Sequence, residues 1–457
     1  MSEKSFLHEA LDKWAPVLDD ESCPALTGDR RRVTAVVMEN TVREQAKSGL
    51  AQNGFLAETA PSSNSANVAN FDPVIIGLLR RAMPKLIAYD FCGVQPMTMP
   101  TGLIFAARNR YTNAAGAETM FNEVDSSWSN GQTAGGTISN GNGGTYPTGG
   151  ATTVGTGPTD ATASVFPWDA AGTFTNPTGV TTVAGEDFGY GTSLNQMTFT
   201  IEKYTVTAVE RGLQAGYTVE LAQDLKAVHG LDAESELSNL LSNQIIAEMN
   251  REVVRTMYKV ATTGSQLTAT PGTFDLDVDA NGRWSVERFK GLMFQIEREA
   301  NRVAQTTRMG RANVIMCSAD VASALAMTGK LDTMGLGKGE ELTVDDTGAT
   351  FVGVLNSKYK VFIDPYMSNG DANQFVVVAY KGKDLGQAGM FYCPYVPLTK
   401  HNAIDPNSFQ PKIAFKTRYA MAGNPLNGAN AAAPNPAQTL QAQSNKFFRI
   451  FRVLNIA

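Results

Sequence analysis

Hydrophobic residues in the first 50 positions recur at helical spacing. One set is separated by four, three and four residues, which places its members on a single face of a helix. The residues on this face are Leu7, Leu11, Trp14 and Leu18. A second helix is predicted over 31–47, and the Ser-, Asn- and Ala-rich stretch 59–70 is typical of a linker. This pattern predicts a self-contained helical segment that docks on a partner or is removed.

Two predicted strands flank a glycine-rich tract. The stretch 101–111 is expected to be extended, and alternation at period two returns over 196–208. Between residues 129 and 157, 10 of 29 residues are glycine, a composition that disfavours both helix and packed strand. We therefore expect a two-stranded arm over 101–208 that carries a long loop or insertion at 112–195. A disordered linker between domains is the alternative.

Helix signals dominate the stretch from residue 218 to residue 304. Thr218 and Asp232 are N-cap candidates, and Gly230 can end the first helix. The second helix, 232–261, would be about 45 Å long, and a third is predicted over 286–304. The inward face of the second helix is predicted to comprise Leu237, Leu240, Leu241, Ile245, Met249, Val253 and Met257.

The remainder of the chain alternates irregularly between strands, one short helix and polar loops. Strands are predicted at 313–317, 359–363, 374–380, 390–392, 413–419 and 447–455, and a helix at 319–327. Because strands and helices mix without a regular βαβ alternation, the predicted fold class is α+β.

Composition narrows the functional classes. Hydrophobic residues make up 43% of 457 residues, enough for a large core, whereas charged residues make up only 18%. The window 111–202 holds eight acidic residues and no Lys or Arg, and the whole chain has a net charge of −6. Neither this window nor the rest of the chain is basic enough to predict tight nucleic-acid binding. The four cysteines are scattered, which indicates a reducing cytoplasm, and no 18-residue apolar window predicts a membrane span.

No pattern of catalytic chemistry occurs. The three histidines lie far apart, and the chain has no HExxH, no CxxC, no GxSxG and no complete phosphate-binding loop. We therefore expect no catalytic, cofactor-binding or metal site, and no enzyme activity.

Several long runs of sequence carry a family resemblance. They are LRRAMPKLIAYD (79–90), CGVQPM (92–97), ELAQDLKAVHG (220–230), NREVV (250–254), YCPYV (392–396) and FKTRY (415–419). These runs resemble the major capsid proteins of T-even-type tailed phages. The resemblance covers about 71–111, 196–306 and 350–422, and it fails over 112–195.

The resemblance implies the Hong Kong 97-type phage capsid fold, with an insertion in its E-loop. The implied parts are a cleaved propeptide (1–58), the N-arm and start of the P-domain (59–100), the E-loop arm (101–208), the P-domain with its spine helix at 232–261 (209–275), the A-domain (276–400) and the return strands of the P-domain (401–457). The arm would then overlie a neighbouring subunit.

The function implied by the resemblance is self-assembly into hexameric capsomers of an icosahedral or elongated phage head. The chain would be made in the host bacterial cytoplasm and end in the virion. Implied partners are neighbouring capsomers, a vertex protein, the portal, an internal scaffold, a prohead protease and decoration proteins, around double-stranded DNA that is enclosed without sequence-specific binding. The alternatives are a pentameric vertex protein of the same fold and a non-shell fibre or adhesin.

The resemblance also implies proteolytic maturation at a Leu/Ile-x-Glu motif. The tripeptide Leu56-Ala57-Glu58, directly before Thr59, fits and lies in the polar linker. The same pattern occurs at 7–9 and 246–248, but Ile246 lies in a predicted helix, where a protease cannot bind an extended strand. Removal of 1–58, which has a net charge of −3, would leave a subunit of net charge −3. We hypothesise that the Leu7, Leu11, Trp14 and Leu18 face docks on the internal scaffold.

Overall fold

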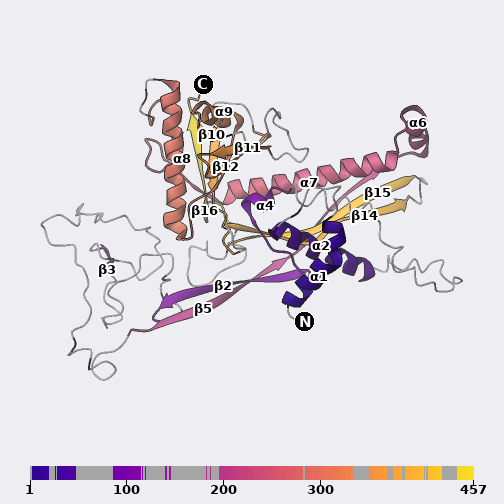
Figure 1. Ribbon diagram of the computed structural model, residues 1–457, viewed down its shortest axis with the longest axis horizontal. Coiled ribbons are helices and arrows are strands. Elements are labelled where there is room, and N and C mark those ends of the chain that lie inside the picture. The colour runs from indigo at the N-terminus through magenta and orange to yellow at the C-terminus, as the bar shows by residue number, and fades with distance from the viewer. Residues whose placement is uncertain are drawn as a thin grey trace.

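The structure is a computed structural model of the whole chain (Figure 1). Apart from isolated positions, it describes residues 3–19, 28–47, 86–116, 139–140, 144–145, 195–332, 350–367, 374–382, 386–424 and 440–456. The predicted cleavage site at 56–59 and most of the predicted insertion 112–195 lie outside the described residues.

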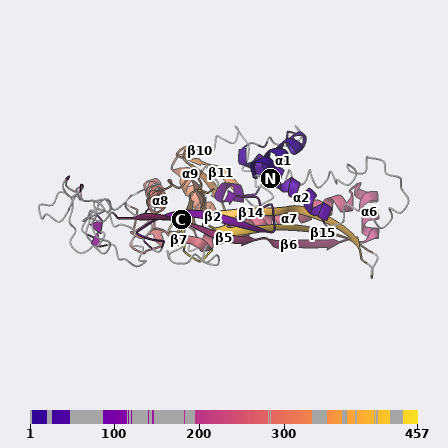
Figure 2. The ribbon, with the colours of Figure 1, turned by 90° about the horizontal axis from the view of Figure 1, so that it is seen from below.

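The N-terminal segment forms two helices, α1 (Glu3–Leu18) and α2 (Gly28–Lys47). Trp14 and Leu18 of α1 are buried, as the predicted helix face requires. In α2, every residue from Val33 to Met38 is buried, so this helix has no solvent-exposed side along that stretch. Figure 2 shows α2 between α1 and β14 (Met390–Ile404). The segment is therefore not self-contained, because α2 forms part of the hydrophobic core of the subunit.

A four-stranded sheet runs along the middle of the molecule. Its order is β1 (Gly93–Val94), β14, β15 (Pro411–Gly423) and β6 (Val209–Gly216). The long helix α7 (Ala233–Val260) packs against β6 and β15, and α4 (Ala88–Phe91) precedes β1. Asp232 caps α7 by accepting a hydrogen bond from the Ser235 amide. The predicted inward face of α7 is buried except at Leu237, which is half-buried, and Leu240, which is exposed.

A second sheet and two helices form the other half of the molecule (Figure 1). The sheet has the order β10 (Leu331–Asp332), β11 (Thr350–Leu355), β12 (Tyr359–Ile363), β9 (Val314–Cys317), β13 (Phe375–Ala379), β16 (Asn445–Leu454) and β7 (Ala261–Thr263), with β8 (Thr273–Asp275) also pairing with β16. Helix α8 (Ser285–Thr307) packs on β13 and β16, and α9 (Ala319–Met327) packs against α8.

The expected strand pair is present as an antiparallel ribbon. Strand β2 (Thr101–Tyr111) pairs with β5 (Met197–Thr207) along its whole length, and β3 (Ser139–Asn140) pairs with β4 (Gly144–Thr145). Figure 1 shows the β2–β5 ribbon projecting away from the rest of the chain. We refer to it as the arm.

The two sheets divide the chain at other points than the expected domain boundaries. Strand β14, which begins at Met390, pairs with β15, whereas the expected boundary lay at residue 400. Strand β16 was expected among the return strands of 401–457, but it pairs with β13 in the larger sheet. Strands β7 and β8, placed in 209–275 by expectation, also belong to the larger sheet. Strand order depends on long-range pairing, which local sequence patterns do not contain.

A buried carboxylate holds together three elements of the larger half. Glu299 of α8 is fully buried, and its Oε1 accepts hydrogen bonds from the Ser265 amide and the Gln295 side chain, both at 3.0 Å. It also pairs with Arg302 at 3.3 Å and with Arg449 of β16 at 2.8 Å. Burial lowers the pKa of the Arg449 guanidinium, while the Glu299 charge opposes that shift. Glu299 therefore neutralises the two arginines and accepts the hydrogen bonds of the amide and of the Gln295 side chain.

We expect Glu299→Ala to lower the free energy of unfolding by about 3–5 kcal/mol, because it leaves two partly buried cations and a buried amide without their partner. Denaturant unfolding of the purified subunit measures this loss. Lys290→Ala, at an exposed position of the same helix, should change the free energy by less than about 0.5 kcal/mol. An equally small change for Glu299→Ala would show that the network contributes little.

Candidate assembly surfaces

One face of the arm is apolar and open to solvent. Because cross-strand partners share a face, odd-numbered residues of β2 and β5 lie together: Leu103 faces Thr205, and Asn109 faces Phe199. The large exposed hydrophobic side chains on this face are Leu103, Phe105, Met197, Phe199 and Ile201, each more than half exposed. Several large exposed hydrophobic side chains on one face make this surface a candidate site of protein interaction. We call it the odd face of the arm.

The opposite face of the arm packs on the subunit itself. Val206 is buried in a small cluster with Met97 of the segment after β1 and with residues of β14. Further along the arm, Arg110 is buried and donates hydrogen bonds to the Thr200 hydroxyl and the Gly116 carbonyl, both at 3.1 Å. The arm is thus anchored on the subunit near Val206, and the five large apolar side chains of its odd face are left exposed.

A second exposed surface lies at the end of α7 farthest from the larger sheet (Figure 1). Helix α6 (Val219–His229) has the predicted ends, with Thr218 accepting from the Leu221 amide and Gly230 in the left-handed conformation. It buries no residue, and Val219, Leu221 and Val228 are exposed. An 11-residue helix with no buried face gains little from its own hydrogen bonds. This geometry is typical of an element that is covered in an assembly.

The structure places the three Leu/Ile-x-Glu tripeptides differently. Residues 7–9 lie within α1 and residues 246–248 lie within α7, where Ile246 is buried. Both are therefore in helical backbone, which a protease that needs an extended strand cannot bind. The tripeptide Leu56-Ala57-Glu58 and Thr59 lie outside the described residues. Cleavage after Glu58 stays a prediction, but its two competitors are disfavoured.

The proposed scaffold-docking face is turned into the subunit. Trp14 is buried and donates from Nε1 to Glu39 of α2 at 3.3 Å, and Leu18 is buried in the main core. Leu11 is half-buried against the same core, and the side chain of Leu7 lies outside the described residues. These side chains are not available to a scaffold while α1 stays in this position.

The described residues contain no arrangement of catalytic chemistry. No group of three or more His, Cys, Asp or Glu side chains that could hold a metal occurs among them. Burial raises the pKa of the Cys92, Cys317 and Cys393 thiols to about 12, which leaves them protonated and unreactive near neutral pH. None of the helices described is long and apolar enough to cross a membrane.

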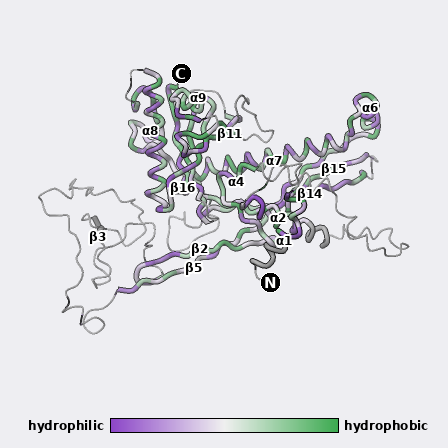
Figure 3. Tube along the Cα trace, in the orientation of Figure 1, coloured by the Kyte–Doolittle hydropathy of each residue, from purple (hydrophilic) through white to green (hydrophobic). Residues whose placement is uncertain are grey.

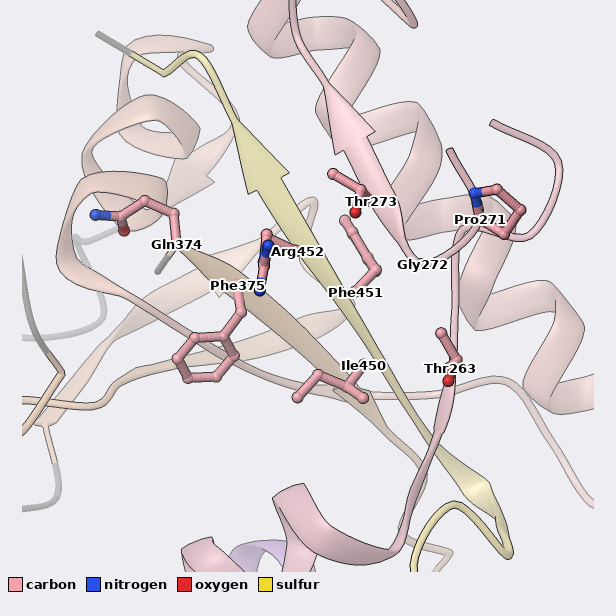
Figure 4. Close-up of a pocket in the computed structure, with 9 residues that line it drawn as sticks. All are labelled: Thr263, Pro271, Gly272, Thr273, Gln374, Phe375, Ile450, Phe451 and Arg452. Carbon is pink, nitrogen blue, oxygen red and sulfur yellow. The ribbon is translucent and has the colours of Figure 1, made fainter. Parts of the chain in front are cut away.

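The pocket shown in Figure 4 also lacks an arrangement of catalytic side chains. It has a volume of about 470 Å³ and lies between β7, β8, β13 and β16. Its lining residues are Thr263, Pro271, Gly272, Thr273, Gln374, Phe375, Ile450, Phe451 and Arg452. Arg452 is the one charged residue in this set, so the pocket has no acid and base pair for proton transfer.

Comparison with known proteins identifies the family. The model of the family described as "Major capsid protein Gp23" matches residues 68–453. The chain belongs to this family. The Gp23 family is a family of structural capsid proteins, so this chain is a major capsid protein of a tailed phage and not an enzyme. It forms the virion shell by assembly with neighbouring capsid subunits.

Two relatives in sequence agree with the Gp23 assignment. The chain is 38% identical to the major capsid protein of Serratia phage KSP90, over 93% of this chain and 92% of that one. It is 36% identical to the major capsid protein of Enterobacteria phage T4, over 95% and 94%. The solved capsid of Myoviridae Phage XM1 covers 58% of this chain and 81% of that chain, with a TM-score of 0.36 and 11% identity.

The same comparisons rank the alternatives. The capsid vertex protein of Enterobacteria phage T4 is 26% identical over 50% of this chain and 53% of its own length. The relation to major capsid proteins covers nearly twice as much of the chain at higher identity. The Gp23 family match over most of the chain also rules out the fibre or adhesin alternative.

The candidate functional residues that sequence patterns missed are those of the odd face. The strands themselves were predicted, but not which face would remain exposed. The signal that can find such a face is the position of Arg108 and Arg110 on the buried side of a strand whose Leu103 and Phe105 point outward. An inverted amphipathic pattern of this kind indicates that a partner covers the apolar side.

Proposed function

We propose that this capsid subunit builds hexameric capsomers of the Hong Kong 97-type, in which the arm is the E-loop. In this assignment, α7 is the spine helix of a P-domain formed with the four-stranded sheet, and the larger sheet with α8 and α9 is the A-domain. The observation that carries the proposal is the odd face of the arm, whose five large apolar side chains have no cover within the described subunit. A neighbouring copy supplies that cover.

Two features of the chain support assembly through many modest contacts. The arm and α6 lie at different ends of the molecule in Figure 1, so one subunit can contact neighbours on both sides. Head-to-tail contacts of this kind close into rings when the rotation between copies is a whole fraction of a turn. Contacts within the ring are assigned to the arm, and contacts between capsomers to α6.

Maturation by cleavage after Glu58 completes the proposal. The internal scaffold, the prohead protease, the vertex protein, the portal and decoration proteins are the proposed partners, and the shell encloses double-stranded DNA through shape and size rather than base contacts. Because Trp14 and Leu18 are buried in the subunit, scaffold docking through their face requires α1 to detach first. In the sequence, the predicted insertion 112–195 connects the two strands of the arm.

Electron microscopy of the purified full chain tests the proposal. We expect hexameric rings, tubes or shells, because head-to-tail contact through the arm propagates from copy to copy. Pentameric rings would favour the vertex alternative, and monomers that persist at high concentration would contradict assembly through the arm. N-terminal sequencing of subunits from virions is expected to begin at Thr59.

A further inference from the structure

We propose that α2 is a latch that stays bound to its own subunit after the chain between α2 and residue 59 has been cut, and that the subunit must change shape to release it. The inference deepens the proposed maturation step and rests on it only for the biological timing of the cut. It concerns an interaction surface on the P-domain whose occupant is one helix of the same chain, held by two specific side chains.

The first specific contact is the buried side-chain amide of Asn40. It donates to the Met97 carbonyl at 2.7 Å and to the Tyr395 carbonyl at 3.0 Å. The pairing of β14 with β15 shifts register between Pro394 and Val396, so Tyr395 is the bulged residue of β14. A carbonyl at a bulge lies outside the regular ladder, and here a donor from α2 serves it. Removal of α2 would take this donor from two backbone groups in a buried place.

The second specific contact is made by Arg30 in the first turn of α2. Its guanidinium lies 5.3 Å from the centre of the Tyr89 ring and 3.5 Å from the Asp90 carboxylate. Lys360 of β12 also pairs with Asp90, at 3.3 Å. Asp90 therefore keeps a cation when Arg30 leaves, so this contact adds to binding without making release impossible. The two contacts are ten residues apart, or about 15 Å along the helix.

Apolar packing between these two contacts binds the helix firmly. The residues from Val33 to Met38 are buried on every side of α2, because α1 covers one side and β14 lies on another. All the contacts named above join α2 to α1 or to residues after 86, and none is made by residues 48–58. Cutting a peptide bond near residue 58 therefore removes none of these contacts, and it lowers only the effective concentration of the helix near its site.

Release consequently needs a change in the surface that α2 occupies. That surface includes the segment ending at Met97, from which the arm begins at Thr101, and the bulge of β14. A shift of the arm during assembly or expansion would move the Met97 carbonyl away from Asn40. Docking of the arm on a neighbour and departure of α2 are linked in this way through the three residues between Met97 and Thr101.

Two substitutions in the uncut chain test whether the contacts of Asn40 and Arg30, rather than the stability of the helix alone, hold α2 in place. Asn40→Asp replaces the amide donor with a carboxylate that faces two carbonyl oxygens, and we expect hydrogen exchange of the amides in 33–41 to rise by about tenfold or more. Arg30→Ala should give a smaller rise. Arg32→Ala is the matched control, since Arg32 is exposed and its ion pair is with Asp29 of the same helix. Equal exchange in all three variants would overturn the roles given to Asn40 and Arg30.

A controlled cut tests retention without relying on the natural protease. A recognition sequence for a sequence-specific protease is inserted between residues 48 and 58 of the full chain, and the purified subunit is cut and passed over a sizing column. We expect the N-terminal fragment, which contains α1 and α2, to elute with the body of the wild-type and Arg32→Ala subunits and to separate from the Asn40→Asp subunit. Immediate separation from the wild-type body would overturn the latch. Failure of cleavage after Glu58 in virions would instead contradict the proposed maturation, whatever this experiment shows.

Discussion

Phe105→Asp is expected to abolish shell assembly while the subunit stays folded. Phe105 is 64% exposed on the odd face, opposite Lys203, so the free subunit has room for a carboxylate there. In the assembled shell the same carboxylate would have to leave water against an apolar neighbouring surface. It would lose about 1.5–3 kcal/mol of hydrophobic burial and add a desolvation cost of several kcal/mol. Each 1.4 kcal/mol weakens one contact tenfold, and every subunit of a ring repeats the loss.

The conservative substitution Phe105→Leu separates burial from mere perturbation of the arm. It keeps an apolar side chain at the same place, and we expect rings, tubes or shells to form with it. Electron microscopy gives the assembly state of both variants, and circular dichroism with thermal unfolding shows whether each remains folded. Normal shells from a folded Phe105→Asp subunit would mean that the odd face is not an interface.

Local signals in the sequence predicted the helices well because their ends are determined locally. Thr218 and Asp232 cap their helices through their side chains, Gly230 ends α6 in the left-handed conformation, and α7 begins one residue after its predicted cap. The inward face of α7 failed only near its N-terminal end, where Leu240 is exposed. Helical periodicity tells which residues share a face, but not how far the body that covers this face extends.

Long-range pairing was beyond the sequence patterns. Strand β6 was missed because its sequence, VERGLQAG, is polar and its side chains are exposed or half-exposed. Asn40 was missed for a different reason: it lies in the middle of a helix, and its acceptor Tyr395 is 355 residues away. A bulge carbonyl in a strand and the donor that serves it leave no shared pattern along the chain.

For the candidate surfaces, too, the local element was predicted but its long-range contacts were not. The arm was predicted from its alternation, yet alternation alone favours a buried Leu103–Phe105 side and an exposed arginine side. The structure reverses this, with Arg108 and Arg110 buried. The side of the arm that is buried in the free subunit differs from the side that a neighbour would bury in the shell, and the sequence of one chain has to suit both. The reversal is therefore information about the partner, which only the folded subunit makes visible.

Glu58→Gln is expected to trap unexpanded shells that contain uncut subunits. The substitution removes the charged group that a glutamate-directed protease recognises, and it changes almost nothing in size. With the cut blocked, α1 and α2 remain covalently attached, and any release of α2 from its site is followed by rapid rebinding because the tether keeps it near. Particle diameter by electron microscopy and subunit mass from purified particles measure the effect.

The other two tripeptides supply matched controls for this prediction. Glu9→Gln lies in α1, and Glu248→Gln lies on α7, where the backbone is helical. Both substitutions remove the same group, and both should leave cutting after Glu58 and the final particle diameter unchanged. Glu248→Gln loses in addition an exposed ion pair with Arg211 at 3.5 Å, which contributes less than about 1 kcal/mol. Expanded particles of normal diameter built from uncut Glu58→Gln subunits would show that removal of the N-terminal segment is not what permits expansion.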